Sequence, residues 1–450
     1  MRKVITYGTY DLLHYGHIRL LERAKALGDY FIVGVTADSF DKVRGKINVS
    51  QSLTQRIENV RKTGLADEII VEEYEGQKID DIKRLDVDVF TVGSDWRGYF
   101  DYLSEFCEVV YLDRTQGVSS TELRSDRAAL RLGFIGCAKE MVKQSAEVGY
   151  INGMTVSGVF DPYGGTSPEL QAYKRMDGYD QLLESSDAVF VLSHSRDHFK
   201  HVKTALEAGK HVICESPVAL SEAECDELFA LADDKGLVFA EALKTAYATA
   251  YHHRMLLMVQ SGRIGRVVSV QSTCTSLADL QNDGDALTEK WSSADAWLPT
   301  ALLPILQLLG HETRLCVMTR ADFGSAPGYD AFGKVDFVYG GAAATAMFGK
   351  GVKAEGSLVV AGTEGYVFVP APWWKTDYFE IRREDQTQNR RFFYQLDGEG
   401  IRNELASFAR AIQTDHGYAF IERETTRAIA GLVGRFVLCG DGVLTIDPVS

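Results

Sequence analysis

The sequence predicts an α/β protein in which two parallel-sheet domains precede an α+β domain with an open, mostly antiparallel sheet. Short β-branched runs alternate with helical patterns up to about residue 125, and the alternation resumes at residue 130. From residue 266 onward the runs follow one another directly. Strands separated by helices pair in parallel, whereas consecutive strands pair antiparallel. A chain of 450 residues exceeds one hydrophobic core, so we predict three domains, at 1–125, 130–250 and 251–450.

The first domain is predicted to hold a parallel sheet with crossover helices. A charged passage at 124–127 ends the alternation of strands and helices, and the apolar positions of 18–27 recur with a helical period. The strands are expected at 4–7, 30–35, 68–71, 87–92 and 108–112.

The second and third domains are predicted from the same patterns. Ser221 and Glu224 form an S-x-x-E capping box at the start of one helix. Strands at 130–136, 154–160, 188–192 and 211–214, each followed by a helix, describe a doubly wound sheet. Later strands are expected at 267–273, 331–339, 343–348, 357–362, 366–369 and 378–382, with a helix at 403–414.

The composition excludes several classes of function. Hydrophobic content of 45% and charged content of 25% are ordinary for a soluble globular protein, and no stretch approaches the roughly 18 apolar residues that would cross a membrane. The N-terminus runs directly into a strand, so we expect a cytoplasmic protein without membrane insertion. A net charge of -15 disfavours nucleic acid as a partner. The seven cysteines are never spaced as C-x-x-C, so we expect neither a disulfide framework nor a metal site.

Two histidines stand where the first strand gives way to the first helix. His14 and His17 flank Gly16, so a turn at the glycine brings both imidazoles to the start of the helix. Free amides and the helix dipole favour an anion at that place. Phosphoryl transfer requires an in-line nucleophile and stabilised charge on the equatorial oxygens. The pattern predicts a phosphate site, and a solvated or capping pair of histidines is the alternative.

Three motifs in the first domain resemble a known enzyme family. H-Y-G-H at 14–17 is similar to the H-x-G-H signature of the nucleotidyltransferase superfamily, and the preceding I-T-Y-G-T-Y-D-L-L resembles the glycerol-3-phosphate cytidylyltransferases. R-T-Q-G-V-S-S-T at 114–121 and G-S-D-W at 93–96 match two further motifs of that family. The resemblance implies that His14, His17 and Arg114 are catalytic. It also implies a nucleotide and phosphate site made by Thr9, Tyr10, Asp11, Gly16, Asp95, Trp96, Thr115, Gly117, Ser119, Ser120 and Thr121.

The same resemblance implies the substrates. The family uses CTP with Mg2+, and the phosphate of a small alcohol attacks the nucleotide directly with release of pyrophosphate. Glycerol 3-phosphate matches best, which would give CDP-glycerol, although related enzymes activate other polyol phosphates. Arg44, Lys46 and Arg56 lie where the family carries acceptor-binding and phosphate-binding residues, and a solvated surface is the alternative for each.

The rest of the chain resembles the glucose-fructose oxidoreductase and inositol dehydrogenase family, which joins a Rossmann domain to an open antiparallel sheet. The resemblance is carried by A-L-E-A-G-K-H-V-I-C-E at 205–215, by the glycine turn, by the ends of two strands and by a late helix. It implies a homodimer, since both families often form one. It also implies a nicotinamide dinucleotide (NAD) site at Gly136, Asp161, His198 and Glu215.

Departures from this second family put hydride chemistry in doubt. Ala138 stands where the G-x-x-G-x-G turn has glycine, and Ser216 replaces the lysine of the family's E-K-P motif. A neutral serine hydroxyl cannot take over proton transfer from that lysine. The segment 295–304 lacks the glycine and histidine of the family's D-x-G-x-x-H pattern. Lys244 is the candidate replacement acid or base, with a surface lysine as the alternative, and His252 or His253 could also substitute.

Two interpretations of the second half follow. In the one that we favour, a degenerate oxidoreductase-like region lacks dehydrogenase activity and serves dimerisation, ligand sensing or partner docking. In the other, the enzyme is bifunctional. Its second half then reduces a keto-sugar phosphate with NAD(P)H and supplies the polyol phosphate that the first half activates.

Overall fold

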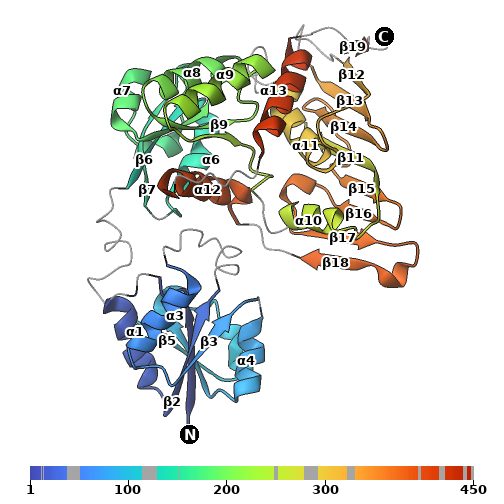
Figure 1. Cartoon of the computed structure of the whole chain (residues 1–450). Helices are drawn as coiled ribbons and strands as arrows, with labels where there is room; N and C mark the ends of the chain where they lie inside the picture. The colour runs from blue at the N-terminus through green and yellow to red at the C-terminus, as the bar shows by residue number, and fades with distance from the viewer. Residues whose placement is uncertain are drawn as a thin grey trace. The chain divides into compact units, whose positions relative to one another are not determined.

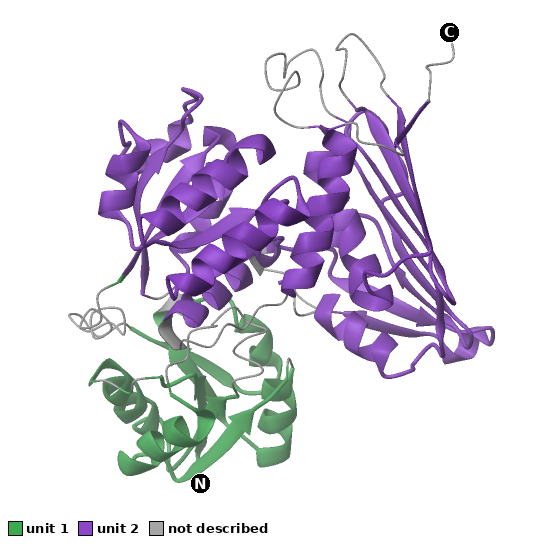
Figure 2. Ribbon diagram, turned by 45° about the horizontal axis from the view of Figure 1, so that its top comes forward, with its two compact units in different colours: residues 1–129 green, residues 130–450 purple. Residues whose placement is uncertain are grey.

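The computed structural model divides the chain into two compact units, residues 1–129 and 130–450 (Figure 2). A further division of the second unit at residue 250 stays a prediction. The structure describes residues 1–11, 13, 15–37, 51–74, 76–113, 129–151, 153–247, 252–277, 292–321, 330–393, 397–414, 421–438 and 443–446.

The first unit is a five-stranded parallel sheet with strand order β3-β2-β1-β4-β5. Helices α1 and α3 cover one face and α4 covers the other (Figure 1). Because the order reverses between β1 and β4, the carboxyl ends of these strands form the crevice where such folds bind ligands. The elements are β1 (Lys3–Gly8), α1 (Tyr15–Lys25), β2 (Tyr30–Thr36), α3 (Leu53–Lys62), β3 (Glu68–Glu72), α4 (Gln77–Leu85), β4 (Val89–Gly93), η1 (Ser94–Trp96), η2 (Asp101–Glu105) and β5 (Glu108–Leu112).

Alternation along β1 gives the first unit a separate core on each face of its sheet. Val4 packs with residues of α1 and α3, whereas its neighbour Ile5 packs with residues of α4. Successive side chains of a strand point to opposite faces, so a fully buried strand supplies both cores. This is why the strand is apolar throughout rather than alternating.

The second unit begins with another five-stranded parallel sheet, in the order β10-β9-β8-β6-β7. Helices α7, α8 and α9 lie on one face and α6 on the other (Figure 1). The hydroxyl of Ser221 caps α9 by accepting the Glu224 amide, and the Glu224 carboxylate accepts the amide of Leu220. The elements are β6 (Leu130–Gly136), α6 (Ala138–Val148), β7 (Met154–Phe160), α7 (Tyr179–Ser185), β8 (Ala188–Leu192), α8 (Ser195–Glu207), β9 (His211–Glu215), α9 (Glu222–Asp234) and β10 (Phe239–Ala242).

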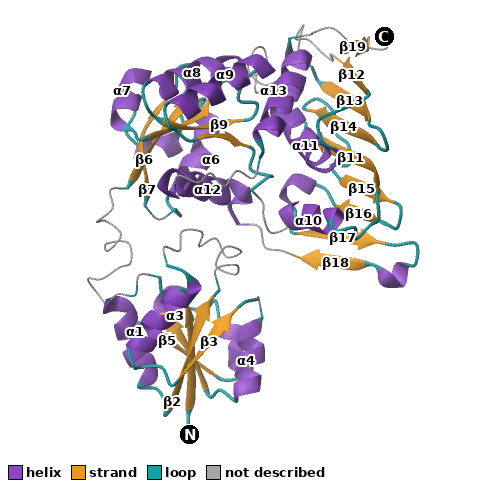
Figure 3. Cartoon of the chain, in the orientation of Figure 1, coloured by secondary structure: helices purple, strands orange, loops and turns teal. Residues whose placement is uncertain are grey.

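A nine-stranded sheet completes the second unit, in the order β18-β17-β16-β15-β11-β14-β13-β12-β19 (Figure 3). Its pairings are antiparallel except for β11 with β14 and β12 with β19, so the predicted fold class is confirmed. The strands are β11 (Val267–Thr275), β12 (Leu315–Ala321), β13 (Phe332–Val338), β14 (Ala343–Gly349), β15 (Leu358–Gly362), β16 (Tyr366–Val369), β17 (Tyr378–Arg382), β18 (Arg390–Phe393) and β19 (Val443–Ile446). The helices are α10 (Arg254–Gln260), α11 (Ser293–Leu309), α12 (Ile401–Thr414) and α13 (Arg423–Val437).

Helix α11 lies in the core of this part and is absent from the sequence prediction. Pro299 and Pro304 fall inside it, and nearly all of its side chains from Ser293 to Leu306 are buried. A helix that is apolar on all sides shows no amphipathic period, so the pattern that reveals surface helices is missing. None of the described helices combines the length and apolar character needed to span a bilayer.

Candidate functional site

The loop that leaves β1 is held in an unusual backbone conformation by a buried aromatic ring. Tyr10 has a φ of 52°, in the left-handed region, and is 2% exposed. A Cβ atom on Gly8 would lie 2.9 Å from the Tyr10 ring, so the glycine makes room for it. Non-glycine residues in this region are uncommon and cluster at functional sites.

His17 lies beside this ring in the first turn of α1. The Tyr10 and His17 rings meet edge to face, with centroids 5.7 Å apart and an interplanar angle of 75°. Burial raises the pKa of Tyr10, so the phenol stays neutral and serves as a packing surface. The imidazole of His17 is thereby oriented at the start of the helix, beside the strand end where anions bind.

Arg56 connects this loop to the neighbouring strand from inside the protein. Its side chain is fully buried on α3, and its Nη1 donates to the carbonyl oxygens of Thr9 at 2.7 Å and Thr36 at 2.8 Å. The Nε donates to the carbonyl of Gln51 at 3.2 Å. The structure therefore places Arg56 behind the carboxyl ends of β1 and β2, where it holds the loop. Acceptor binding by this residue stays a prediction.

A second tie joins the loop to the start of α3. The buried carboxylate of Asp11 accepts the amide of Gln51 at 3.0 Å. Ser52 and Gln55 form a complete capping box on the same helix, with each side chain bound to the other residue's backbone. Asp11 and Arg56 thus fix α3 and the β1 loop relative to each other.

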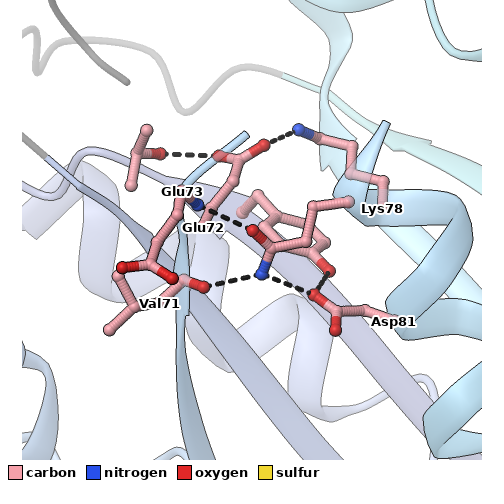
Figure 4. Close-up of polar contacts among 8 residues, drawn as sticks. Val71, Glu72, Glu73, Lys78 and Asp81 are labelled. Atoms are coloured by element: carbon pink, nitrogen blue, oxygen red, sulfur yellow. Dashed lines mark hydrogen bonds and ion pairs between the residues drawn. The ribbon is translucent and has the colours of Figure 1, made fainter. Parts of the chain in front are cut away.

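A buried ion pair lies at the same end of the sheet on the opposite face. Lys78 of α4 and Glu72 of β3 face each other (Figure 4), with side chains 9% and 1% exposed. The other Glu72 oxygen accepts the Thr36 hydroxyl at 2.8 Å. The Lys78 ammonium also lies 4.7 Å from the centre of the Tyr7 ring, a favourable cation–π distance. Thr36 therefore connects the ion pair with Arg56 across the sheet.

Asp81 closes this cluster from α4. Its carboxylate accepts the hydroxyl of Tyr7 at 3.0 Å and the side-chain amide of Gln77 at 3.0 Å (Figure 4). It also pairs with Arg84 at 2.6 Å. Burial, followed by the charge of Asp81, raises the pKa of Tyr7. Sequence reasoning missed the cluster. The only sequence signal for the cluster was the polar side chains at the end of the apolar strand β3 and at the start of α4.

The structure describes the other predicted site residues of the first unit only in part. Gly16 lies in the first turn of α1. Trp96 is on η1, is 36% exposed and packs edge to face on Tyr99 at 5.4 Å. Asp95 is on η1, and its side chain lies outside what the structure describes. The predicted residues His14, Arg44, Lys46, Arg114, Thr115, Gly117, Ser119, Ser120 and Thr121 also lie outside the described residues.

The second unit contains a cavity of about 790 Å³ at the carboxyl ends of β6 to β10. Asp161, Glu215 and Lys244 all line it, and the roles predicted for them stay predictions. Gly136 ends β6 with a φ of 144°, and a Cβ atom there would overlap the backbone of Leu192. The volume is typical of a small-molecule site.

His198 stands behind this cavity and is 1% exposed. Its two ring nitrogens each lie 2.7 Å from a backbone carbonyl oxygen, of Pro217 and of Ser193. Burial lowers the pKa of His198. The ring joins the loops that follow β8 and β9, and its contact with a dinucleotide stays a prediction.

Three carboxyl groups form the deep wall of the cavity. Burial raises the pKa of Glu404 to about 8, and it also raises the pKa of Glu215 and of Asp295. The carboxylates of Glu140 and Glu404 raise that of Glu215 further, while Lys244 opposes them. With a pKa near 8, Glu404 holds its proton at neutral pH and can donate a hydrogen bond. Glu404 and Asp295 were not predicted as site residues, because acidic side chains in helices usually lie on the solvated face.

Two side chains that line the cavity, one at the position of the missing lysine and one the candidate replacement, are already bound to carboxylates. The Ser216 hydroxyl donates to buried Glu241 at 2.5 Å. The Lys244 ammonium donates to Glu399 at 2.9 Å. Neither arrangement favours proton transfer in the cavity.

The turn at the start of α6 suits the adenosine end of a dinucleotide only in part. Asp161 lies at the end of β7, where a ribose-binding carboxylate is expected. Its Oδ2, however, accepts the Ala138 amide at 2.8 Å, which is the first amide of the helix. Glu140 adds a second carboxylate to the first turn. If a nicotinamide dinucleotide bound here, Asp161 would hold its ribose and the nicotinamide would supply the hydride.

Comparison with known proteins identifies the two units separately. Residues 5–126 match the family model described as cytidylyltransferase-like, and residues 130–243 match the oxidoreductase family with an NAD-binding Rossmann fold. The dTDP-3,4-didehydro-2,6-dideoxy-alpha-D-glucose 3-reductase of Streptomyces violaceoruber is 31% identical over 153 residues, which are 33% of this chain and 44% of that protein. The chain thus spans less than half of this curated oxidoreductase.

Solved structures support the fold of the second unit. A 3-ketoreductase from Actinomadura kijaniata, solved with TDP-benzene and NADP, superposes with a TM-score of 0.59 at 19% identity, over 71% of this chain and 100% of that one. At this identity the likeness shows the fold alone.

The first unit has much nearer relatives. The glycerol-3-phosphate cytidylyltransferase of Bacillus spizizenii is 50% identical over 130 residues, which are 29% of this chain and 100% of that protein. The Bacillus subtilis enzyme of the same name is 48% identical over 130 residues, again 100% of its length. The chain is therefore a nucleotidyltransferase that belongs, through its first unit, to the glycerol-3-phosphate cytidylyltransferase family.

Proposed function

We propose that the first unit transfers CMP from CTP to glycerol 3-phosphate and releases pyrophosphate. The observation that carries this proposal is the 50% identity with a glycerol-3-phosphate cytidylyltransferase along that enzyme's whole length. The end of β1 carries the buried Tyr10 ring, with His17 beside it and Arg56 behind it. This arrangement agrees with a phosphate site. A close polyol phosphate is the alternative acceptor.

The chemistry assigned to this site is a single in-line displacement. An oxygen of the acceptor phosphate attacks the α-phosphorus of CTP, and the bond to the bridging oxygen of pyrophosphate breaks. His14, His17 and Arg114 are assigned to stabilise the charge on the α-phosphate, and the remaining predicted nucleotide-binding residues to hold CTP. No covalent enzyme intermediate is needed.

Mg2+ is assigned to enter with the triphosphate. Among the described residues, no group of three histidine, cysteine or acidic side chains is placed to hold a metal. Mg2+ keeps several waters and is commonly bound through substrate phosphates with one or two carboxylates, which agrees with this donor set.

The test is a product assay with a histidine variant. The full chain is incubated with CTP, Mg2+ and either glycerol 3-phosphate or ribitol 5-phosphate, and the products are weighed by mass spectrometry. His17→Ala is expected to slow CMP transfer about a hundredfold or more, as for removal of other groups that stabilise transition-state charge. His253→Ala, an exposed histidine of the second unit, is the matched control. A wild-type rate in His17→Ala would remove His17 from the mechanism.

For the second unit we propose a ligand-binding scaffold without hydride transfer. The bound states of Ser216 and Lys244 support this function. A bifunctional enzyme is the second candidate, favoured by the ketoreductase-like fold and by Asp161 at the end of β7. The same assay separates them. A CDP-alcohol formed from a keto-sugar phosphate only when NADH or NADPH is present would establish the bifunctional enzyme.

A further inference from the structure

The cavity of the second unit is lined by four lysines as well as by carboxyl groups. Lys139 and Lys143 belong to α6, Lys244 follows β10, and Lys350 follows β14. All four residues line the cavity. Positive side chains from separate elements converge on one opening, which is the arrangement that concentrates an anionic ligand.

One carboxylate binds two of these cavity lysines. Glu399 pairs with Lys143, with Lys244 at 2.9 Å and with Lys375 at 3.9 Å. Its side chain is 30% exposed, so solvent reaches the ion pairs. Glu399 thus occupies the two lysines, Lys143 and Lys244, that a ligand anion in the cavity would bind.

The backbone of Glu399 is itself in an unfavourable conformation. Its φ is 50°, in the left-handed region, although the residue is not glycine. Burial opposes ionisation of the carboxyl, but hydrogen bonds from Lys143 and Lys244 outweigh it and lower the pKa of Glu399 to about 2. Residues held in this region persist where surrounding contacts compensate. The ion pairs with the lysines compensate for the backbone strain at Glu399. An anion that displaced its carboxylate would therefore allow this strain to relax.

The deep wall adds hydrogen-bonding groups that the protein leaves unused. Glu404 is 2% exposed and Asp295 is 8% exposed, and both line the cavity. Oε1 of Glu404 and Oδ1 of Asp295 have no hydrogen-bond partner among the described residues. Buried polar atoms are normally satisfied, and hydroxyl groups of a ligand would satisfy these.

We propose that this cavity binds an alcohol phosphate. Its phosphate displaces Glu399 from Lys143 and Lys244, and its hydroxyl groups reach Glu404 and Asp295. Glu399 thus acts as an internal stand-in for the ligand phosphate. The ligand has the same chemistry as the acceptor of the first unit or as the alcohol end of a CDP-linked product. This site is additional to CMP transfer and does not depend on it.

Lysine footprinting on the full chain tests the proposal and reads each lysine separately. The protein is acylated with and without inorganic phosphate, glycerol 3-phosphate, CDP-glycerol or glycerol, and modification is measured by mass spectrometry. Glycerol 3-phosphate or CDP-glycerol is expected to protect Lys143 and Lys244. Lys203, which pairs with Glu227 at 2.7 Å on the surface, should stay unprotected. The better of the two protecting ligands identifies the source of the phosphate.

Two variants sharpen the result. Removing the internal competitor in Glu399→Gln is expected to lower the ligand concentration for half-protection by about tenfold, since about 1.4 kcal/mol is a factor of ten. Glu227→Gln is the matched control and should change nothing. Absence of protection by every phosphate ligand in both wild type and Glu399→Gln would overturn the proposal. Equal protection by inorganic phosphate and glycerol 3-phosphate would overturn the role of Glu404 and Asp295. CMP transfer, measured in the same samples, reports on the first unit alone.

Discussion

At the scale of single residues, we expect the largest loss of stability from substitutions in the ion pair of Lys78 and Glu72. Replacing Lys78 by methionine leaves the Glu72 carboxylate buried without its counter-charge, and breaking such a pair typically costs about 3–5 kcal/mol. We expect the Lys78→Met variant to lose about that much free energy of unfolding in the first unit, measured by urea denaturation with circular dichroism.

A control and a rescue accompany this prediction. Lys62→Met alters an exposed lysine of α3 and should leave the urea midpoint unchanged. The double variant Lys78→Met with Glu72→Leu removes both charges and should recover most of the stability, since apolar replacements of buried pairs are often neutral. A normal midpoint for Lys78→Met alone would contradict the buried pair.

Single residues also show which parts of the candidate sites could be predicted from the sequence. His17 and Asp11 were predicted from a motif, and the structure places both at the strand end that a phosphate site requires. Glu404, Asp295 and Glu399 were not predicted as site residues. Their importance comes from burial and from lysines more than a hundred positions away, and no local spacing encodes either.

At the scale of elements, α3 is the support on which the β1 loop depends. Arg56 binds three carbonyl oxygens at once, and a lysine cannot reproduce the planar fork of a guanidinium. Each hydrogen bond from a charged group contributes about 1.5–3 kcal/mol. Arg56→Lys is therefore expected to lower the free energy of unfolding of the first unit by about 2 kcal/mol and to raise the KM for both CTP and the acceptor.

This variant also separates support from direct acceptor binding. Arg61→Lys, at the exposed end of the same helix, is the control, because Arg61 pairs only with Glu58 among the contacts described for it. If Arg56→Lys instead raised the KM for the acceptor alone and left unfolding unchanged, Arg56 would be an acceptor-binding residue, as the family resemblance implies.

Element prediction succeeded where the period was clear. The bounds of β5, β6, β7, β8, β16 and β17 agree with the predicted runs, because β-branched residues lie between turn residues. Helix α1 begins at Tyr15 and not at residue 18, since the turn at Gly16 is itself helical. The strands β10, β12, β18 and β19 were missed, and length alone does not explain this, because the four-residue strand β16 was predicted. Parallel pairing of β11 with β14 is set by tertiary packing and is invisible to local spacing.

At the scale of the whole molecule, the two compact units predict two unfolding transitions. Each has its own buried cores, so CTP, which is assigned to the first unit, should raise only one of the transitions. That ligand response assigns each transition to its unit without cutting the chain.

The transition of the second unit should depend on pH through Glu404. Its pKa rises from 4.5 to about 8 on folding, mainly by burial, with Glu241 raising it and Lys244 opposing. The folded state therefore binds more protons than the unfolded state between these values, and stability falls as pH increases through that window. The Glu404→Gln variant cannot ionise. It should come close to wild type near pH 5 and exceed it above pH 8 by up to about 5 kcal/mol.

Scanning calorimetry of both proteins from pH 5 to about pH 8.5 measures this difference. Comparing the variant with wild type cancels the titrating groups that Glu404 does not perturb. Glu215 does not cancel, because Glu404 raises its pKa. Glu227→Gln on the surface serves as the control. Parallel curves for wild type and Glu404→Gln would mean that Glu404 ionises normally, and the deep wall of the cavity would then present an unprotonated carboxylate at neutral pH. A gap that widens with pH instead leaves a protonated carboxyl there, able to donate a hydrogen bond to a ligand hydroxyl as well as accept one.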